Sequence, residues 1–211
     1  MPAVYAQDVL AIMNKLEVRR AVFVGTSMGG LITMVVAALA PDRVGASVLN
    51  DVGPRLNVEG LSRIAGYVGR TQSMPTWAAA AEAVRTIAGA AYPRRLDDEA
   101  FWLAFAKRTF REREDGQFET DYDPHIALAF TDFDPEAPPP DMAPLFQALA
   151  AMPMLSIRGG ISDLLSAEMV SHMRALKPDM EAVTIEDIGH APMLDEPEAW
   201  DALLDFLAKV E

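Results

Sequence analysis

The feature of the sequence that most constrains the fold is the turn Gly25-Thr-Ser-Met-Gly29, which separates two apolar runs. Before it, Arg20–Val24 (RAVFV) is typical of a buried parallel strand, and after it Leu31–Leu39 predicts a helix that stops at Pro41. A sharp strand-to-helix turn of this kind strains the backbone of its central serine and exposes the hydroxyl at the carboxyl edge of a sheet. Ser27 is therefore the candidate nucleophile, and the alternative is a glycine-rich turn with an N-capping serine.

Strand and helix patterns alternate on both sides of a middle region that has only helical patterns. Three more strands are predicted, at Val44–Leu49, Met154–Ile157 and Ala182–Ile185. Helices are predicted at Val4–Leu16, Ser166–Leu176 and Glu196–Val210, and in the middle region at Leu61–Thr71, Thr76–Ala90 and Asp98–Arg113. This alternation predicts an α/β fold with a mostly parallel sheet and an inserted helical subdomain. The predicted segments are 1–54 and 151–211 for the two parts of the core and 55–150 for the insertion.

A serine hydroxyl is a weak nucleophile unless a base lies within hydrogen-bond reach, and three histidines could supply that base. His190 follows a predicted strand, on the loop before the last helix, where α/β sheets carry ligands and catalytic groups. His125 lies in the insertion and His172 in a predicted surface helix, and both fit ordinary exposed or partly packed histidines. His190 is therefore predicted to be the base.

A third group must bond the other imidazole nitrogen, and two aspartates at strand ends could do so. Asp163 follows the strand at Met154–Ile157 and gives the chain order Ser, Asp, His that this kind of turn leads us to expect. Asp51 ends the strand at Val44–Leu49 and occupies an equivalent edge. We predict Asp163 as the acid, with Asp51 as its competitor, and assign Asp187 to the structure of the histidine loop.

Three motifs, GTSMGG, RGGISDLLS and GHAPMLDEPEAW, resemble the nucleophile, acid and histidine motifs of the α/β-hydrolase superfamily. They are most similar to its capped branch of small-molecule esterases, enol-lactonases and carbon–carbon bond hydrolases, and VLNDVGP fits the entry to the cap. The resemblance implies a triad of Ser27, Asp163 and His190, with the Met28 N–H as one oxyanion donor. It implies hydrolysis of a small ester, lactone or activated carbonyl through an acyl-enzyme, without metal or organic cofactor.

Two other functions stay open. A carbon–carbon bond hydrolase or enol-lactonase would use the same triad, and a non-catalytic module could keep the fold without the reaction. The cap is expected to close over the site and set substrate preference, with Trp77, Phe101, Trp102 and Phe105 as candidate lining residues. The alternative for these four aromatic residues is ordinary packing between helices.

The N-terminal part departs from the superfamily pattern. One helix and one strand precede Ser27, where the superfamily has several strand–helix units, and no His-Gly pair is present to mark the loop of the second oxyanion donor. We therefore expect a sheet that is N-terminally incomplete, with Arg20–Val24 as an uncovered edge and with low activity of the chain alone. The alternative is a genuinely shortened hydrolase-like protein.

Composition limits the partners. The net charge of −13 argues against nucleic acid or an anionic membrane surface as a partner and leaves a small-molecule substrate and a possible homo-oligomer. The absence of cysteine excludes disulfides, thiolate metal sites and a cysteine nucleophile. The first residues lack the basic and apolar regions of a signal peptide, so a cytoplasmic location is expected.

Overall fold

The computed structural model describes residues 2–210, and the chain divides into two compact units. The core unit combines Met1–Leu61 with Pro135–Glu211, and the insert unit is Ser62–Asp134. The terminal residues Met1 and Glu211, which end the predicted core segments, lie outside the described residues.

The insertion is narrower than the predicted 55–150, because both of its flanks are bonded to the core unit. The N–H of Asn57 donates to the Leu164 carbonyl at 2.9 Å, and the N–H of Met142 donates to the Pro54 carbonyl at 2.8 Å. The side chain of Phe146 is also fully buried within the core unit. Residues 55–61 and 135–150 therefore belong to the core.

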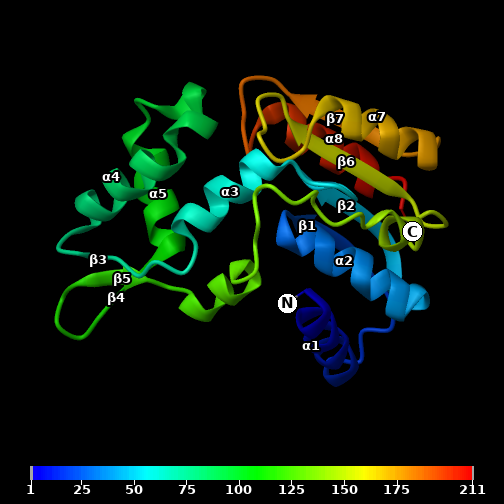
Figure 1. Cartoon of the computed structure of the whole chain (residues 1–211), viewed down its shortest axis with the longest axis horizontal. Helices are drawn as coiled ribbons and strands as arrows, with labels where there is room; N and C mark the ends of the chain where they lie inside the picture. Colours follow the sequence, from blue (N-terminus) through cyan, green and yellow to red (C-terminus); the bar gives the residue numbers. More distant parts are fainter. Residues whose placement is uncertain (1, 211) are drawn as a thin grey trace. The chain divides into compact units, whose positions relative to one another are not determined.

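The core unit contains a four-stranded parallel sheet in the order β1-β2-β6-β7 (Figure 1). Its strands are β1 (Ala21–Thr26), β2 (Val44–Asn50), β6 (Met154–Gly159) and β7 (Glu181–Ile185). All three strand pairs are parallel, as predicted, so the carboxyl ends of the strands meet at one edge of the sheet. The residues that follow the four strands therefore lie along this one edge of the sheet.

Burial separates the central strands from the edge strands. Every residue of β2 is buried, which explains its mostly apolar sequence, because a central strand of a parallel sheet is covered on both faces. In β1, at the edge, burial alternates, and the side chains of Val22 and Val24 are 38% and 47% exposed. The predicted strand Arg20–Val24 thus corresponds to β1, one of the two edge strands of this sheet.

Helices flank this sheet in the predicted order, except for one short helix, α6 (Ala143–Gln147), that the sequence pattern did not predict. The others are α1 (Pro2–Lys15), α2 (Met28–Leu39), α7 (Ala167–Leu176) and α8 (Pro197–Leu207). Helix α2 contacts α1, β1 and β2, while α8 contacts β6 and β7. In the described range 2–210, no helix is both long and apolar enough to cross a membrane.

The insert unit is not purely helical, which corrects the prediction. It contains most of α3 (Val58–Tyr67), together with α4 (Trp77–Ala88) and α5 (Glu99–Thr109), and a small antiparallel sheet in the order β3-β5-β4. Its strands are β3 (Ser73–Met74), β4 (Phe110–Glu112) and β5 (Phe118–Thr120). The predicted helix Asp98–Arg113 ends early because Phe110 and Phe118 are buried by pairing β4 with β5.

Aromatic side chains form the centre of the insert unit. Tyr92 has ring contacts to Phe101, Trp102 and Phe105 at centroid distances of 5.5, 6.1 and 6.1 Å. The side chains of Phe101 and Trp102 are buried, and the Trp102 Nε1–H donates to the Arg95 carbonyl at 2.8 Å. These contacts are those of a packed core.

Helical starts in the insert unit are held by carboxylate caps. The backbone N–H of Phe101 holds the pKa of Asp98 below its usual value at the start of α5. The backbone N–H of His125 does the same for the pKa of Asp123 before the 3-10 helix Pro124–Phe130. Because both pKa values are lowered by folding, these caps contribute stability above about pH 4 that is lost as pH falls through the folded-state values.

The glycines of the turn Gly25–Gly29 lead to a stability prediction. A Cβ at Gly25 would lie 2.6 Å from the backbone of Gly29 and Gly30, whereas a Cβ at Gly29 would meet no atom within 4 Å. We expect Gly25→Ala to lower the free energy of unfolding by about 1–3 kcal/mol, because the strand and helix must move apart. We expect Gly29→Ala to leave it unchanged or raise it by up to about 1 kcal/mol, because alanine favours the helix.

Urea denaturation followed by circular dichroism measures both free energies of unfolding. Equal destabilisation by the two substitutions would contradict the steric explanation of the Gly25 position.

Candidate active site

Ser27 occupies the turn between β1 and α2 with a strained backbone. Its φ of 51° and ψ of −117° lie in a region that non-glycine residues rarely adopt. Its N–H donates to the Asn50 carbonyl at 3.0 Å, which continues the pairing of β1 with β2 and holds the strained conformation. The predicted sharp turn from a strand through Ser27 into a helix is thus present.

His190 lies beside Ser27, on the loop between β7 and α8. The His190 Nε2 atom is 2.9 Å from Ser27 Oγ, and the imidazole side chain is 8% exposed. Two buried side chains hold this loop. Asn50 Nδ2 donates to the Pro192 carbonyl at 2.8 Å, and the Glu196 carboxylate accepts the backbone N–H groups of Met193 and Leu194 at 3.0 Å each.

The acid that contacts His190 is Asp51, not the predicted Asp163. His190 Nδ1 is 2.7 Å from Asp51 Oδ2, and the Asp51 side chain has no exposed surface. A carboxylate accepts only, so Nδ1 carries the proton and Nε2 is left to accept from the Ser27 hydroxyl. This is the arrangement in which a histidine can act as a general base toward serine.

The geometry of β2 explains why Asp51 fills this place. Strand β2 lies between β1 and β6, so its carboxyl end is adjacent to the end that carries Ser27. Asp51 has a φ of 54°, and its N–H donates to the Ile157 carbonyl at 2.7 Å, which ends the strand in a tight turn. Asp163 follows β6, two strands from β1, in a loop where its backbone carbonyl accepts the N–H of Gly60 at 3.1 Å.

Two further groups bond the Asp51 carboxylate, and sequence reasoning missed both of them. The Gly159 N–H donates to Oδ1 at 2.9 Å, and the Ser162 hydroxyl is 2.6 Å from Oδ2. A Cβ at Gly159 would lie 2.5 Å from the carbonyl oxygens of Ile188 and Gly189, so only glycine lets the β6 end approach the histidine loop. The neighbouring Asp163 drew attention in the sequence, and nothing in the pattern singled out Ser162.

Met28 is the first residue of α2, as an oxyanion donor at an elbow should be. The N–H groups of Gly30 and Leu31 donate to the Ser27 carbonyl at 2.9 and 3.3 Å. The N–H of Met28 precedes them and has no carbonyl one turn earlier in its own helix. The Met28 N–H therefore lies at the positive end of the helix dipole, next to the serine. Its role as an oxyanion donor stays a prediction.

The other candidate residues belong to the insert unit or to the surface. Phe101 and Trp102 are buried in the aromatic core, which supports the packing alternative for them. Trp77 is half-buried, with its ring centroid 4.3 Å from that of Phe118. Contact of substrate with Trp77, Phe101, Trp102 and Phe105 stays a prediction. His125 is exposed beside Asp123, and His172 is exposed on α7, in agreement with the surface assignment of both.

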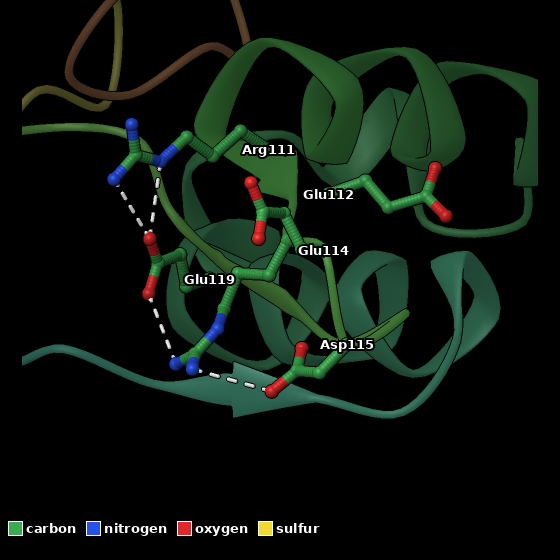
Figure 2. A pocket seen from close by; sticks show the side chains of 6 residues that line it. Arg111, Glu112, Glu114, Asp115 and Glu119 are labelled. Atoms are coloured by element: carbon green, nitrogen blue, oxygen red, sulfur yellow. Dashed lines mark hydrogen bonds and ion pairs between the residues drawn. The ribbon is translucent and has the colours of Figure 1, made fainter.

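A hollow lies on the β4–β5 hairpin of the insert unit and is lined entirely by charged side chains (Figure 2). The lining residues are Arg111, Glu112, Arg113, Glu114, Asp115 and Glu119. Arg111 donates to Glu119 at 2.7 Å, and Arg113 pairs with Asp115 at 3.2 Å and with Glu119 at 3.3 Å. Because both arginines of the described lining are paired with carboxylates of the same hairpin and the lining holds neither serine nor histidine, the hollow does not compete with the Ser27 site.

Comparison with known proteins identifies the family of the chain. The model of the alpha/beta hydrolase family matches residues 2–203. The chain belongs to this family. It is 34% identical over 196 residues to the 3-hydroxybutyrate-oligomer hydrolase of Cupriavidus necator, an alignment that spans 92% of this chain and 67% of that protein. The predicted superfamily and fold class are therefore confirmed, and the chain is an alpha/beta hydrolase enzyme.

Solved structures of other alpha/beta hydrolases share the fold. One from Novosphingobium aromaticivorans is 44% identical and superposes with a TM-score of 0.89, covering 100% of this chain and 73% of that one. An esterase from Mycobacterium tuberculosis is 23% identical, with a TM-score of 0.71 over 99% of this chain and 68% of that one, and resembles it in fold alone.

The identity of the acid can be tested by two matched substitutions in this hydrolase. We expect Asp51→Asn to lower the turnover of p-nitrophenyl esters by about 10⁴-fold, because an amide in this place favours the wrong imidazole tautomer. We expect Asp163→Asn to keep the turnover of the unaltered chain, because the hydrogen bond to His190 comes from Asp51. If Asp163→Asn lowered the turnover and Asp51→Asn did not, Asp163 would be the acid.

Proposed function

We propose that this hydrolase cleaves a short-chain carboxylic ester through an acyl-enzyme formed on Ser27. The observation that carries the proposal is the continuous row of three side chains, with 2.9 Å between Ser27 and His190 and 2.7 Å between His190 and Asp51. All three belong to the core unit and follow strands of one sheet. The buried carboxylate favours the imidazolium that forms when the serine loses its proton.

The reaction then runs in two halves. Ser27 Oγ attacks the ester carbonyl carbon while its proton moves to His190 Nε2, and the negative charge on the carbonyl oxygen is stabilised by the Met28 N–H. The bond from this carbon to the alkoxide oxygen breaks, and His190 returns the proton to the departing alcohol. Water attacks the acyl-serine in the same way, releasing the carboxylic acid and restoring Ser27.

The substrate class follows from the relative named above. The Cupriavidus protein is a 3-hydroxybutyrate-oligomer hydrolase, and oligomers of a hydroxy acid are joined by carboxylic ester bonds. Esters of short 3-hydroxy acids are therefore the proposed substrates. Hydrolysis of a lactone or of a carbon–carbon bond would use the same three side chains and is a separate outcome of the substrate comparison.

The nucleophile is tested by Ser27→Ala. We expect this substitution to abolish covalent labelling by a fluorophosphonate and to lower hydrolysis of p-nitrophenyl butyrate by about 10⁴-fold or more, because no other hydroxyl is bonded to His190 Nε2 in the described structure. Ser171→Ala is the matched control, since the Ser171 hydroxyl is exposed on α7 and bonds only its own helix at Ala167. Full labelling of the Ser27→Ala variant would refute the proposal.

The substrate class is tested by steady-state kinetics on three compounds: a linear 3-hydroxybutyrate dimer, a simple p-nitrophenyl ester and a vinylogous diketone. We expect the highest kcat/KM for the dimer. Faster cleavage of the diketone than of either ester would instead assign the chain to carbon–carbon bond hydrolysis.

A further inference from the structure

Ser162 lies in the loop after β6 and reaches the same carboxylate oxygen as the histidine. Its Oγ atom is 2.6 Å from Asp51 Oδ2, and His190 Nδ1 is 2.7 Å from that oxygen. A hydroxyl-to-carboxylate distance of 2.6 Å is in the short range of charge-assisted hydrogen bonds. The row of side chains therefore continues beyond the acid, from Ser27 through His190 and Asp51 to Ser162.

The direction of the Ser162 hydrogen bond is fixed by its neighbours. The backbone N–H groups of Leu164 and Leu165 both donate to Ser162 Oγ, each at 3.1 Å. A hydroxyl has one proton and two acceptor lone pairs, and these two N–H groups occupy the lone pairs. The single proton of Ser162 is thus directed at Asp51, and the hydroxyl cannot turn away without losing bonds to the loop.

The Asp51 carboxylate is held at both oxygens as a result. The Gly159 N–H fixes Oδ1 at 2.9 Å, and Ser162 and His190 share Oδ2. Because the side chain is fully buried, these donors replace the water that would otherwise solvate its charge. A carboxylate held in this way cannot rotate, so the direction in which it accepts the Nδ1–H of His190 is set in advance.

We propose that Ser162 is a positioning residue for the hydrolytic reaction, acting on His190 through Asp51; this inference rests on the proposed function. Its hydroxyl fixes the carboxylate, the carboxylate fixes the plane of the imidazole, and the imidazole keeps Nε2 at 2.9 Å from Ser27 Oγ. In the segment Ser162-Asp163, the side chain that bonds the Asp51 carboxylate is that of the serine.

The experiment compares Ser162→Ala, Ser162→Thr and Ser166→Ala. Alanine removes the hydroxyl, whereas threonine keeps it and adds a methyl group at a half-buried position. Ser166 is the matched control from the same loop, because its hydroxyl accepts the Met169 N–H at the start of α7. The measurements are kcat and KM for p-nitrophenyl butyrate, and solvent exchange of the His190 Nδ1–H proton, detected by nuclear magnetic resonance of ¹⁵N-histidine protein.

We expect Ser162→Ala to lower kcat about tenfold with unchanged KM and to speed exchange of the Nδ1–H proton about tenfold, the effect of losing one hydrogen bond to a charged group. Ser162→Thr should restore both values, and Ser166→Ala should leave both as in the unaltered chain. A merely structural role in the loop would predict equal effects of the two alanine substitutions. Parent-like exchange in a folded Ser162→Ala variant would overturn the proposal.

The labelling result separates this inference from the function on which it rests. If fluorophosphonate leaves Ser27 of the unaltered chain unlabelled, the proposed hydrolysis fails, while the exchange measurement still decides whether Ser162 holds Asp51 and His190. If Ser162→Ala does not fold, Ser162→Cys keeps the side-chain volume with a weaker donor. Exchange in the cysteine variant as slow as in the unaltered chain would then overturn the proposal.

Discussion

The structure of the site depends on one buried carboxylate. Asp51 has no exposed surface, and three elements satisfy its charge: the end of β6 through the Gly159 N–H, the following loop through Ser162, and the histidine loop through His190. Removing a buried carboxylate from such donors would cost several kcal/mol, so the loops after β6 and β7 are bound to the end of β2. The carboxylate therefore accepts the hydrogen bond of the histidine and fixes the loops around it.

Close backbone approach makes this arrangement possible. Gly25 allows β1 to touch the first turn of α2, and Gly159 allows the end of β6 to touch the carbonyls of Ile188 and Gly189. The strained φ of 51° at Ser27 and of 54° at Asp51 occurs at the proposed nucleophile and at the carboxylate that contacts His190. Such strain persists where surrounding bonds fix it, and both N–H groups are bonded to a neighbouring strand, to Asn50 and Ile157.

The chemistry of the triad and the packing of the insert belong to different units of the chain. The core unit holds all four side chains of the row, in the two segments that the insert unit separates in the sequence: Ser27 and Asp51 in the first, Ser162 and His190 in the second. The insert unit has its own aromatic centre around Tyr92 and its own small sheet. The aromatic core of the insert unit therefore packs apart from the hydrogen bonds that hold these four side chains in the core unit.

The sequence by itself determined the local features of this hydrolase. The apolar runs of β1 and β2, the glycines around Ser27 and the position of His190 after a strand predicted the α/β fold, the serine and the base, because each depends on short-range pattern. The hairpin of β4 and β5 was missed because its burial of Phe110 overrides a helical pattern. Only the tertiary structure decided between Asp51 and Asp163. Both follow parallel strands and both have the right chemistry, and β6, which precedes Asp163, is the neighbour of the strand before His190, so strand order does not choose between them. The contact is decided by the turn after β2, where Asp51 has a φ of 54° and its Oδ2 lies 2.7 Å from His190 Nδ1.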